Sequence, residues 1–197
     1  MWNDRYSEPG FLFGTEPAAF LVDQQEYLIR GQKALAIADG EGRNSIFMAE
    51  KGMVVTAQDA SDVAIDKARG LASVREARVD FQHADLHEWE WAEDEYDLVA
   101  AIFIQFADAP FRDAIFAGLQ KTLRPGGVLM LHGYTPKQVE YGTGGPPSAK
   151  NMYTEKLLQG AFADMDILRL EAYDRIVDEG RGHSGKSALI DLIARKK

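Results

Sequence analysis

The stretch ALAIADGEGRNSIFMAEKGMVVTAQDAS, residues 34–61, combines a strand, a glycine turn, a helix and a second strand within a short distance. Its apolar run at 33–39 is nearly continuous, which is typical of a strand that is covered on both faces of a sheet. Gly40 and Gly42 follow it, and the run at 53–59 has the composition of a second strand. This order predicts a βαβ unit with two parallel strands, since parallel strands need a crossover connection.

The segments outside this unit continue the alternation of strand and helix. Further extended segments are predicted at 79–85, 96–106, 128–134, 165–180 and 187–197. The connection between the last two, EGRGHSG, is short enough for a hairpin rather than a helical crossover. Upstream, Thr15 and Pro17 predict a helix that runs to about Arg30, because proline suits the first helical turn. The fold class is therefore α/β, with a parallel sheet that ends in an antiparallel pair.

Composition places the chain among ordinary globular proteins, and we expect one domain that spans residues 1–197. The net charge of −9 would repel a phosphate backbone, so nucleic acid is not an expected partner. The chain has no cysteine, which excludes disulfides, thiolate zinc sites and cysteine nucleophiles. No apolar run approaches the roughly 18 residues of a membrane span, and the N-terminus lacks the layout of a signal peptide. We therefore expect a cytoplasmic protein with no membrane partner.

The glycine turn is the first candidate for a ligand site. Glycines between a strand and a helix let the backbone approach a ligand, and the N–H groups at the helix start point outward. Asp59 ends the next strand, where a carboxylate is well placed to bind ribose hydroxyls. Asp85 follows the third strand and could accept a hydrogen bond from an adenine amino group, while Leu86 covers the base. A tight turn with capping acids would explain the same residues, but their occurrence in this order favours a nucleotide-like ligand.

Two other patterns carry less weight. The segment GRGHSGKS at 180–187 matches the spacing of a P-loop, but a P-loop lies between a strand and a helix, and here extended segments flank it. His83, Asp85 and His87 suggest a metal site, yet successive residues at a strand end rarely converge on one ion. We therefore expect neither nucleotide hydrolysis nor a bound metal.

Residues 34–61 resemble the first two motifs of the class I S-adenosylmethionine-dependent methyltransferases, a glycine-rich loop and a ribose-binding acid. HADL at 83–86 is similar to the third-strand acid motif of this family, and LRPGGVLML at 123–131 to its Pro-Gly-Gly turn. The chain departs from the family pattern at Ala36, where an acid is usual, and at Ala38, where the first glycine is usual. The loss of that acid removes one polar contact near the methionine moiety, for which Asp39 or the N-terminal segment could substitute.

A closer likeness is to a small bacterial subgroup near the tellurite-resistance-type methyltransferases. The shared segments are FLFGTEPAAFL at 11–21, YGTGGPPS at 141–148 and GRGHSG at 180–185. The resemblance implies a Rossmann-like, seven-stranded sheet in the order 3-2-1-4-5-7-6, with strand 7 antiparallel and helices on both faces. Residues 1–30 are then expected to form a lid that includes a helix, and 135–150 a Gly/Pro-rich active-site loop.

The resemblance also implies the reaction: in-line methyl transfer from S-adenosyl-L-methionine to a small-molecule acceptor, with S-adenosyl-L-homocysteine as product. The cofactor-binding residues that it implies are Ala38, Gly40, Gly42, Asp59, Ala60, Asp85, Leu86 and Gln105. By position and family likeness, the groups expected near the acceptor are Tyr6, Tyr141 and His183.

Two alternatives share part of this pattern. A nicotinamide-dependent oxidoreductase of Rossmann type would also use a glycine turn and an acid after the second strand, but its third glycine is Ser45 here. A protein that binds S-adenosylmethionine without catalysis would be consistent with Ala36 and Ala38. Nothing in the sequence indicates the acceptor or the oligomeric state.

Overall fold

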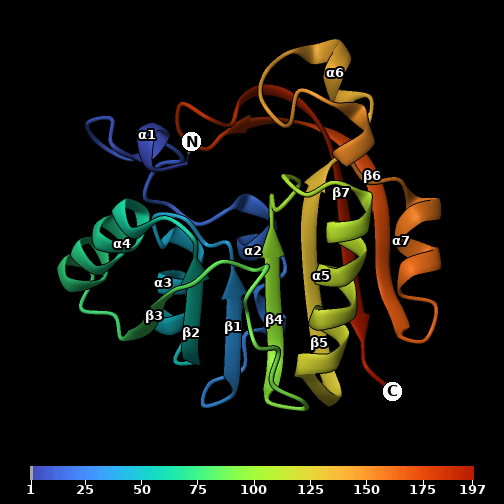
Figure 1. The fold of residues 1–197 in the computed structure, drawn as a ribbon, viewed down its shortest axis with the longest axis horizontal. Helices are drawn as coiled ribbons and strands as arrows, with labels where there is room; N and C mark the ends of the chain where they lie inside the picture. Colours follow the sequence, from blue (N-terminus) through green and yellow to red (C-terminus); the bar gives the residue numbers. More distant parts are fainter. Residues whose placement is uncertain (1) are drawn as a thin grey trace.

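The structure is a computed structural model that describes residues 2–197, and it contains a seven-stranded sheet covered by helices (Figure 1). The strands are β1 (Lys33–Ile37), β2 (Val54–Asp59), β3 (Val79–His83), β4 (Tyr96–Ile102), β5 (Leu123–Tyr134), β6 (Asp166–Asp178) and β7 (Ser184–Arg195). Their order is β3-β2-β1-β4-β5-β7-β6, and β7 runs antiparallel to both of its neighbours. The fold class and strand order expected from the sequence are confirmed.

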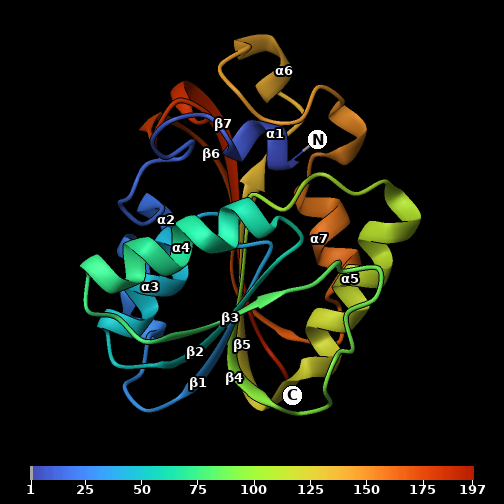
Figure 2. The ribbon, with the colours of Figure 1, turned by 60° about the vertical axis from the view of Figure 1, so that its left-hand side comes forward.

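Helices cover both faces of this sheet (Figure 2). The α-helices are α1 (Trp2–Tyr6), α2 (Ala19–Asp23), α3 (Arg43–Glu50), α4 (Asp62–Val74), α5 (Ala109–Thr122), α6 (Gln138–Tyr141) and α7 (Glu155–Ala161). Two short 3-10 helices are η1 (Gln25–Tyr27) and η2 (Ala149–Asn151). α2, α3 and α4 lie on one side of the sheet and α5 and α7 on the other (Figure 2). No helix within residues 2–197 is long and apolar enough to cross a membrane.

The apolar strand sequences follow from burial on both faces. Alternate side chains of a strand point to opposite faces, so Leu35 joins the apolar cluster under α5 while Ala36 joins the cluster under α2 and α3. The central strand β4 is buried from Leu98 to Ile102, whereas the edge strand β6 keeps most of its residues partly or fully exposed. Helix starts have their own signals, and Ser61 caps α4 by accepting the N–H of Ala64 at 3.1 Å.

The helix predicted for residues 15–30 is wrong in extent. α2 covers five residues, and η1 follows it after Gln24. Tertiary contacts hold the preceding backbone extended, because the N–H of Ala18 donates to Asn44 Oδ1 at 2.9 Å and the carbonyl of Thr15 accepts from Arg75. These side chains come from α3 and from the residue after α4. Residues 15–18 are therefore bound to other elements and do not form the first turns of a helix.

Strand ends also differ from the sequence predictions. β4 ends at Ile102 rather than at residue 106, because Phe103 takes a left-handed backbone (φ 56°) that cannot continue a strand. β1 and β3 end two residues earlier than predicted, at Ile37 and His83. β5 begins at Leu123 rather than at residue 128, because Leu123 pairs with Tyr96 of β4 and the RPGG segment forms a bulge before Val128 pairs with Leu98.

The closing hairpin is confirmed. β6 and β7 pair from Asp166 opposite Arg195 to Asp178 opposite Ser184. The P-loop-like segment 180–187 therefore forms the hairpin turn and the start of β7, with a strand and not a helix after it. In both views this turn lies near α1, above the carboxyl ends of the parallel strands (Figures 1 and 2).

Candidate active site

The turn between β1 and α3 has a left-handed backbone at every second residue: Ala38 (φ 45°), Gly40 (62°) and Gly42 (89°). A Cβ on Gly42 would lie 2.7 Å from the Cβ of Ala68, so α3 and α4 approach this closely because residue 42 is glycine. Ala38 adopts the conformation that glycine prefers, which explains how it can stand at a family glycine position. Its N–H donates to the Gln58 side chain at 3.1 Å, which holds the turn against β2.

Asp59 lies beside this turn, at the end of β2. Its carboxylate accepts the N–H of Gly40 at 2.8 Å and the N–H of Ser61 at 2.8 Å. Burial raises the pKa of Asp59, and the hydrogen bonds from the two backbone N–H groups oppose that rise. The structure thus brings Gly40 and Asp59 together at one edge of the sheet. Ala60 follows, exposed, with its carbonyl oxygen 3.1 Å from His83 Nε2.

Asp39 is a further acid of this turn. Its carboxylate accepts hydrogen bonds from the hydroxyl and the N–H of Ser45 in the first turn of α3. Burial raises the pKa of Asp39 to about 7, and the nearby charge of Asp59 adds to the rise. Asp39 lies one residue after Ala38, the family's usual glycine position. The sequence indicated Asp39 as a site residue only through its place next to Gly40.

The raised pKa of Asp39 predicts that this residue makes the protein less stable as pH rises. The unfolded carboxyl ionises near pH 4, whereas the folded one holds its proton until about pH 7, so stability is lost across that interval. Asp39→Asn cannot ionise, so it does not lose stability in this way. The difference in free energy of unfolding between Asp39→Asn and the wild type should therefore increase by about 2 kcal/mol, in favour of the variant, between pH 5 and pH 8. Urea unfolding at both pH values measures this. Asp66→Asn, on the exposed side of α4, is the control, and an equal advantage of Asp39→Asn at both pH values would contradict the prediction.

The predicted adenine-binding pair lies at the end of β3. The Asp85 carboxylate accepts the N–H of His87 at 2.9 Å at an exposed position, while Leu86 is buried in the cluster under α5. Gln105 lies after β4 and is buried, and its amide bonds both the N–H (2.7 Å) and the carbonyl (2.8 Å) of Tyr134. Gln105 therefore joins the end of β4 to the end of β5 by two hydrogen bonds. The contacts of Gln105, Asp85 and Leu86 with the cofactor stay predictions.

His183 lies in a buried group of rings at the carboxyl edge, which we call the aromatic cluster (Tyr6, Phe13, Phe103, Tyr134 and His183). His183 Nδ1 is 2.9 Å from the Tyr134 hydroxyl, and its ring packs edge-on against Phe103 (4.0 Å between centroids) and Phe13 (4.5 Å). Burial and then the charge of Arg43 lower the pKa of His183 to about 3, so the imidazole is neutral at neutral pH. The rings come from four different parts of the chain, which is why sequence reasoning missed Phe13, Phe103 and Tyr134.

The two tyrosines predicted near the acceptor occupy different places. Tyr6 is buried beside the glycine turn, where a Cβ on Gly40 would lie 2.7 Å from its hydroxyl oxygen, and burial raises the pKa of that hydroxyl. Tyr141 is on α6, and its hydroxyl donates to Asp174 of β6 at 2.8 Å while Lys186 lies over its ring. The structure brings Tyr6 into the aromatic cluster, whereas Tyr141 contacts Asp174 of β6 and Lys186 of β7.

Charged side chains of α3 and its preceding turn hold the N-terminal segment over this site. The buried Glu41 carboxylate accepts the N–H of Leu12 at 2.7 Å and pairs with Lys67 at 3.1 Å. Arg43 pairs with Glu179 at 2.8 Å, and both side chains are about nine-tenths buried. Glu179 also accepts the N–H of Ala19 at 3.0 Å. Glu41 and Arg43 flank Gly42 in sequence, but the positions of their partners were not deducible from it.

Metal binding has no structural support in the described part of the chain. No group of three or more His, Asp or Glu side chains within residues 2–197 is placed to hold a metal ion. His83 contacts the carbonyl of Ala60, and His87 stacks on Phe111 at 3.6 Å between centroids, so the two histidines are engaged with different partners.

Comparison with known proteins relates this chain to a family. Residues 34–127, which contain the glycine turn and Asp59 and make up just under half of the chain, match the family model described as a methyltransferase domain. This part of the chain is similar to the S-adenosylmethionine-dependent methyltransferases. A protein of Synechocystis sp. named as an uncharacterised methyltransferase is 28% identical over 102 residues, which are 51% of this chain and 46% of that protein. The match thus spans less than half the length of this curated relative.

Solved structures share the methyltransferase fold at low sequence identity. One, reported for the conversion of a disulfide bond into a thioacetal group during echinomycin biosynthesis, has a TM-score of 0.78 at 20% identity, covering 100% of this chain and 91% of that one. TehB of Haemophilus influenzae has a TM-score of 0.73 at 18% identity, covering 100% and 66%. Magnesium protoporphyrin IX methyltransferase of Synechocystis, with bound S-adenosylhomocysteine, has a TM-score of 0.67 at 18% identity, covering 91% and 79%. Binding of S-adenosylmethionine is typical of this family.

Proposed function

We propose that this methyltransferase transfers a methyl group from S-adenosylmethionine to a small-molecule acceptor. The observation that carries the proposal is the turn at 38–42, whose glycines let a ligand approach the backbone and which sets the Asp59 carboxylate 2.8 Å from the N–H of Gly40. Ligands of open α/β sheets bind at the carboxyl ends of the strands, and this turn follows the carboxyl end of β1. Leu12 and Phe13, within the predicted lid, contact Glu41 of this turn through their N–H groups, which supports the lid's proposed place.

The chain's own residues would bind and orient the reactants. When bound, the cofactor supplies an activated methyl group, so alignment and exclusion of water account for most of the rate. We propose that Asp59 binds the ribose hydroxyls and that Asp85 reads the adenine amino group, with Leu86 and Ala60 beside the base. Ala38, Gly40 and Gly42 let the backbone approach the cofactor.

The acceptor is proposed to lie against the aromatic cluster. A pKa of about 3 makes His183 a weak base, so its role would be to orient a hydroxyl or amine by hydrogen bonding rather than to remove its proton. Tyr6 and His183 both contact Phe13 of the N-terminal segment, so residues 1–30 would close over the acceptor and shield it from water. An aromatic, largely uncharged surface favours a small and partly apolar acceptor. The loop at 135–150 would form another wall, since Gly144 bridges to His183.

Calorimetric titration with S-adenosylhomocysteine, NAD and ATP tests the cofactor. Micromolar binding of S-adenosylhomocysteine alone is the expected result, and binding of NAD or ATP in its place would overturn the proposal. Methyl transfer is tested separately, with labelled S-adenosylmethionine and a panel of small oxygen, nitrogen and sulfur acceptors. Tight cofactor binding with no transfer to any of them would favour the non-catalytic alternative.

Asp59→Ala should weaken S-adenosylhomocysteine binding by about 1–3 kcal/mol, or roughly 5- to 150-fold, through lost charge-assisted hydrogen bonds. The same titration measures the change, and Asp66→Ala, an exposed acid of α4, should bind like the wild type. Because Asp59 also pairs with Gly40 and Ser61, the folding of the variant is checked by thermal unfolding. A folded variant with unchanged affinity would show that Asp59 does not hold the ribose.

A further inference from the structure

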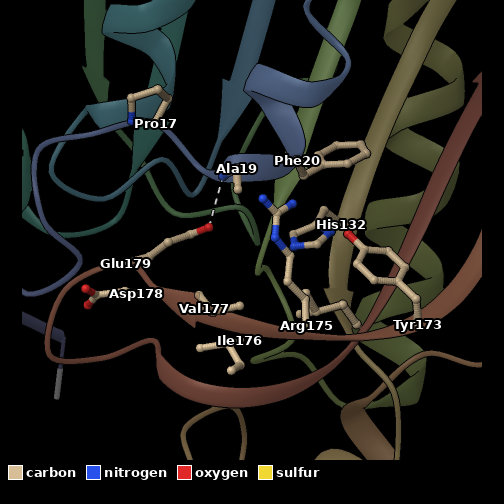
Figure 3. Close-up of a pocket in the computed structure, with 11 residues that line it drawn as sticks. Pro17, Ala19, Phe20, His132, Tyr173, Arg175, Ile176, Val177, Asp178 and Glu179 are labelled. Carbon is tan, nitrogen blue, oxygen red and sulfur yellow. Dashed lines mark hydrogen bonds between the residues drawn. The ribbon is translucent and has the colours of Figure 1, made fainter.

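A cavity lies on the face of the sheet under α2, apart from the glycine turn. Its volume is about 190 Å³, and Phe20 of α2, His132 of β5, Tyr173 and Arg175 of β6 and Leu189 of β7 line it. Figure 3 shows Phe20, His132 and Tyr173 gathered on one side of it, with Glu179 on the other. A cavity of roughly 150 Å³ already holds a benzene molecule, so this one has room for a single small ring.

Three donors converge on a carboxylate behind this cavity. Asp191 of β7 is buried and lies 2.8 Å from His132 Nδ1, 3.0 Å from Arg169 Nε and 3.1 Å from the Tyr173 hydroxyl. Arg169 Nε–H and the Tyr173 hydroxyl donate to this carboxylate, and Nδ1 of His132 is placed to donate to it as the third group. In the neutral ring that carries its hydrogen on Nδ1, Nε2 has a lone pair that can accept a hydrogen bond.

Packing fixes the His132 ring and leaves its Nε2 edge toward the cavity. The ring stacks on Phe20 (4.8 Å, 7°) and meets Phe103 edge-on (4.7 Å, 74°). No hydrogen bond to Nε2 is formed by the described residues, 2–197. Among those residues, the only fully buried side-chain nitrogen or oxygen atom without a hydrogen-bond partner is Thr122 Oγ1. Because Nε2 of His132 also has no partner, it is not fully buried, and it faces the cavity that His132 lines.

Two of the three charged side chains that line the cavity are already paired within the protein, and the third, Asp178, is exposed to solvent. Arg175 pairs with Asp23 of α2 at 2.6 Å, and Glu179 pairs with Arg43 at 2.8 Å. A charged ligand would have to break one of these pairs, whereas a neutral one would not. We propose that this cavity binds a small neutral ring compound with one O–H or N–H group, which donates to Nε2 of His132. The site is separate from the cofactor and acceptor positions proposed above and does not depend on them.

Phenol and anisole are the probes, because they share a ring and differ in the donor. Both are titrated into the protein with 15N-labelled histidine and followed by NMR. Phenol should bind at least fivefold more tightly than anisole, since one net hydrogen bond is worth about this factor, and should shift the Nε2 resonance of His132. Equal affinities, no binding of phenol, or an unmoved Nε2 resonance would each overturn the proposal. These measurements use the wild-type protein and need no variant.

Two variants locate the binding. His132→Phe keeps a ring against Phe20 but has no acceptor, so the preference for phenol over anisole should disappear while anisole still binds. Ala19→Leu adds volume where Ala19 lines the cavity, and both probes should bind at least tenfold more weakly. Val22→Leu changes the same helix at a residue outside the lining and should bind both probes like the wild type.

Discussion

Replacing Arg43 by methionine is expected to lower the free energy of unfolding by about 3 kcal/mol. Arg43 begins α3, and its guanidinium is 2.8 Å from the Glu179 carboxylate, with 6% and 10% of the two side chains exposed. Without Arg43, Glu179 would keep a buried charge whose remaining partner is the N–H of Ala19. The cost of that uncompensated charge, rather than the attraction itself, sets the size of the effect. Urea unfolding followed by circular dichroism measures it.

The matched control is an ion pair of the same length at the surface. Lys33 and Glu95 are 2.7 Å apart, but 50% and 39% of their side chains are exposed. Lys33→Met should therefore cost at most about 1 kcal/mol, because solvent screens the pair. In the double variant Arg43→Met/Glu179→Gln, removal of both charges should restore part of the loss. If Arg43→Met were no more costly than Lys33→Met, burial would not be the source of the effect.

Replacing Gly42 by alanine is expected to lower the free energy of unfolding by about 3 kcal/mol. Two costs add: the backbone at φ 89° is strained for any residue with a side chain, and the new Cβ would lie 2.7 Å from the Ala68 Cβ. A methyl group cannot rotate away from a contact, so α3 and α4 would have to move apart. Because we propose that Gly42 also lets the backbone approach the cofactor, S-adenosylhomocysteine binding should weaken as well.

Gly70→Ala is the control, with an effect of the opposite sign. Gly70 lies within α4, and nothing lies within 4 Å of the Cβ that alanine would add. Alanine in a helix interior should raise the free energy of unfolding by about 0.5–1 kcal/mol, because glycine loses more backbone entropy on folding. Thermal unfolding of Gly42→Ala and Gly70→Ala measures both changes in stability. A stable Gly42→Ala protein with unchanged cofactor affinity would show that the turn does not need glycine at residue 42.

Both residues lie where the N-terminal segment, the glycine turn and the β6–β7 hairpin meet. Gly182 of that hairpin donates its N–H to the carbonyl of Leu12 at 3.1 Å, and Glu41 accepts the N–H of the same residue. Under the proposed function, cofactor binding beneath this segment would require these contacts to open. The Gly182–Leu12 hydrogen bond joins segments more than 100 residues apart, so the site depends on contacts between distant parts of the chain.

Local sequence patterns were sufficient to predict the strands of the sheet. The run at 34–37 is apolar because β1 is covered on both faces, and that property is visible without the partner strands. The glycine turn, Asp59 at the end of β2 and the final hairpin were likewise predictable, since turn geometry and chain connectivity depend on neighbours in sequence. Strand order followed from family resemblance, not from the residues alone.

Long-range contacts decided the rest. Residues 15–30 have a helical pattern, but Asn44, Arg75 and Glu179 bind their backbone and leave five residues in α2. Gln105 lies at the predicted edge, yet its amide bonds the backbone of Tyr134. The sequence by itself determined the α/β sheet, its glycine turn and the acids at its strand ends. Only the tertiary structure decided which side chains surround His183 and His132, because those neighbours are brought together by packing between distant segments and leave no local pattern.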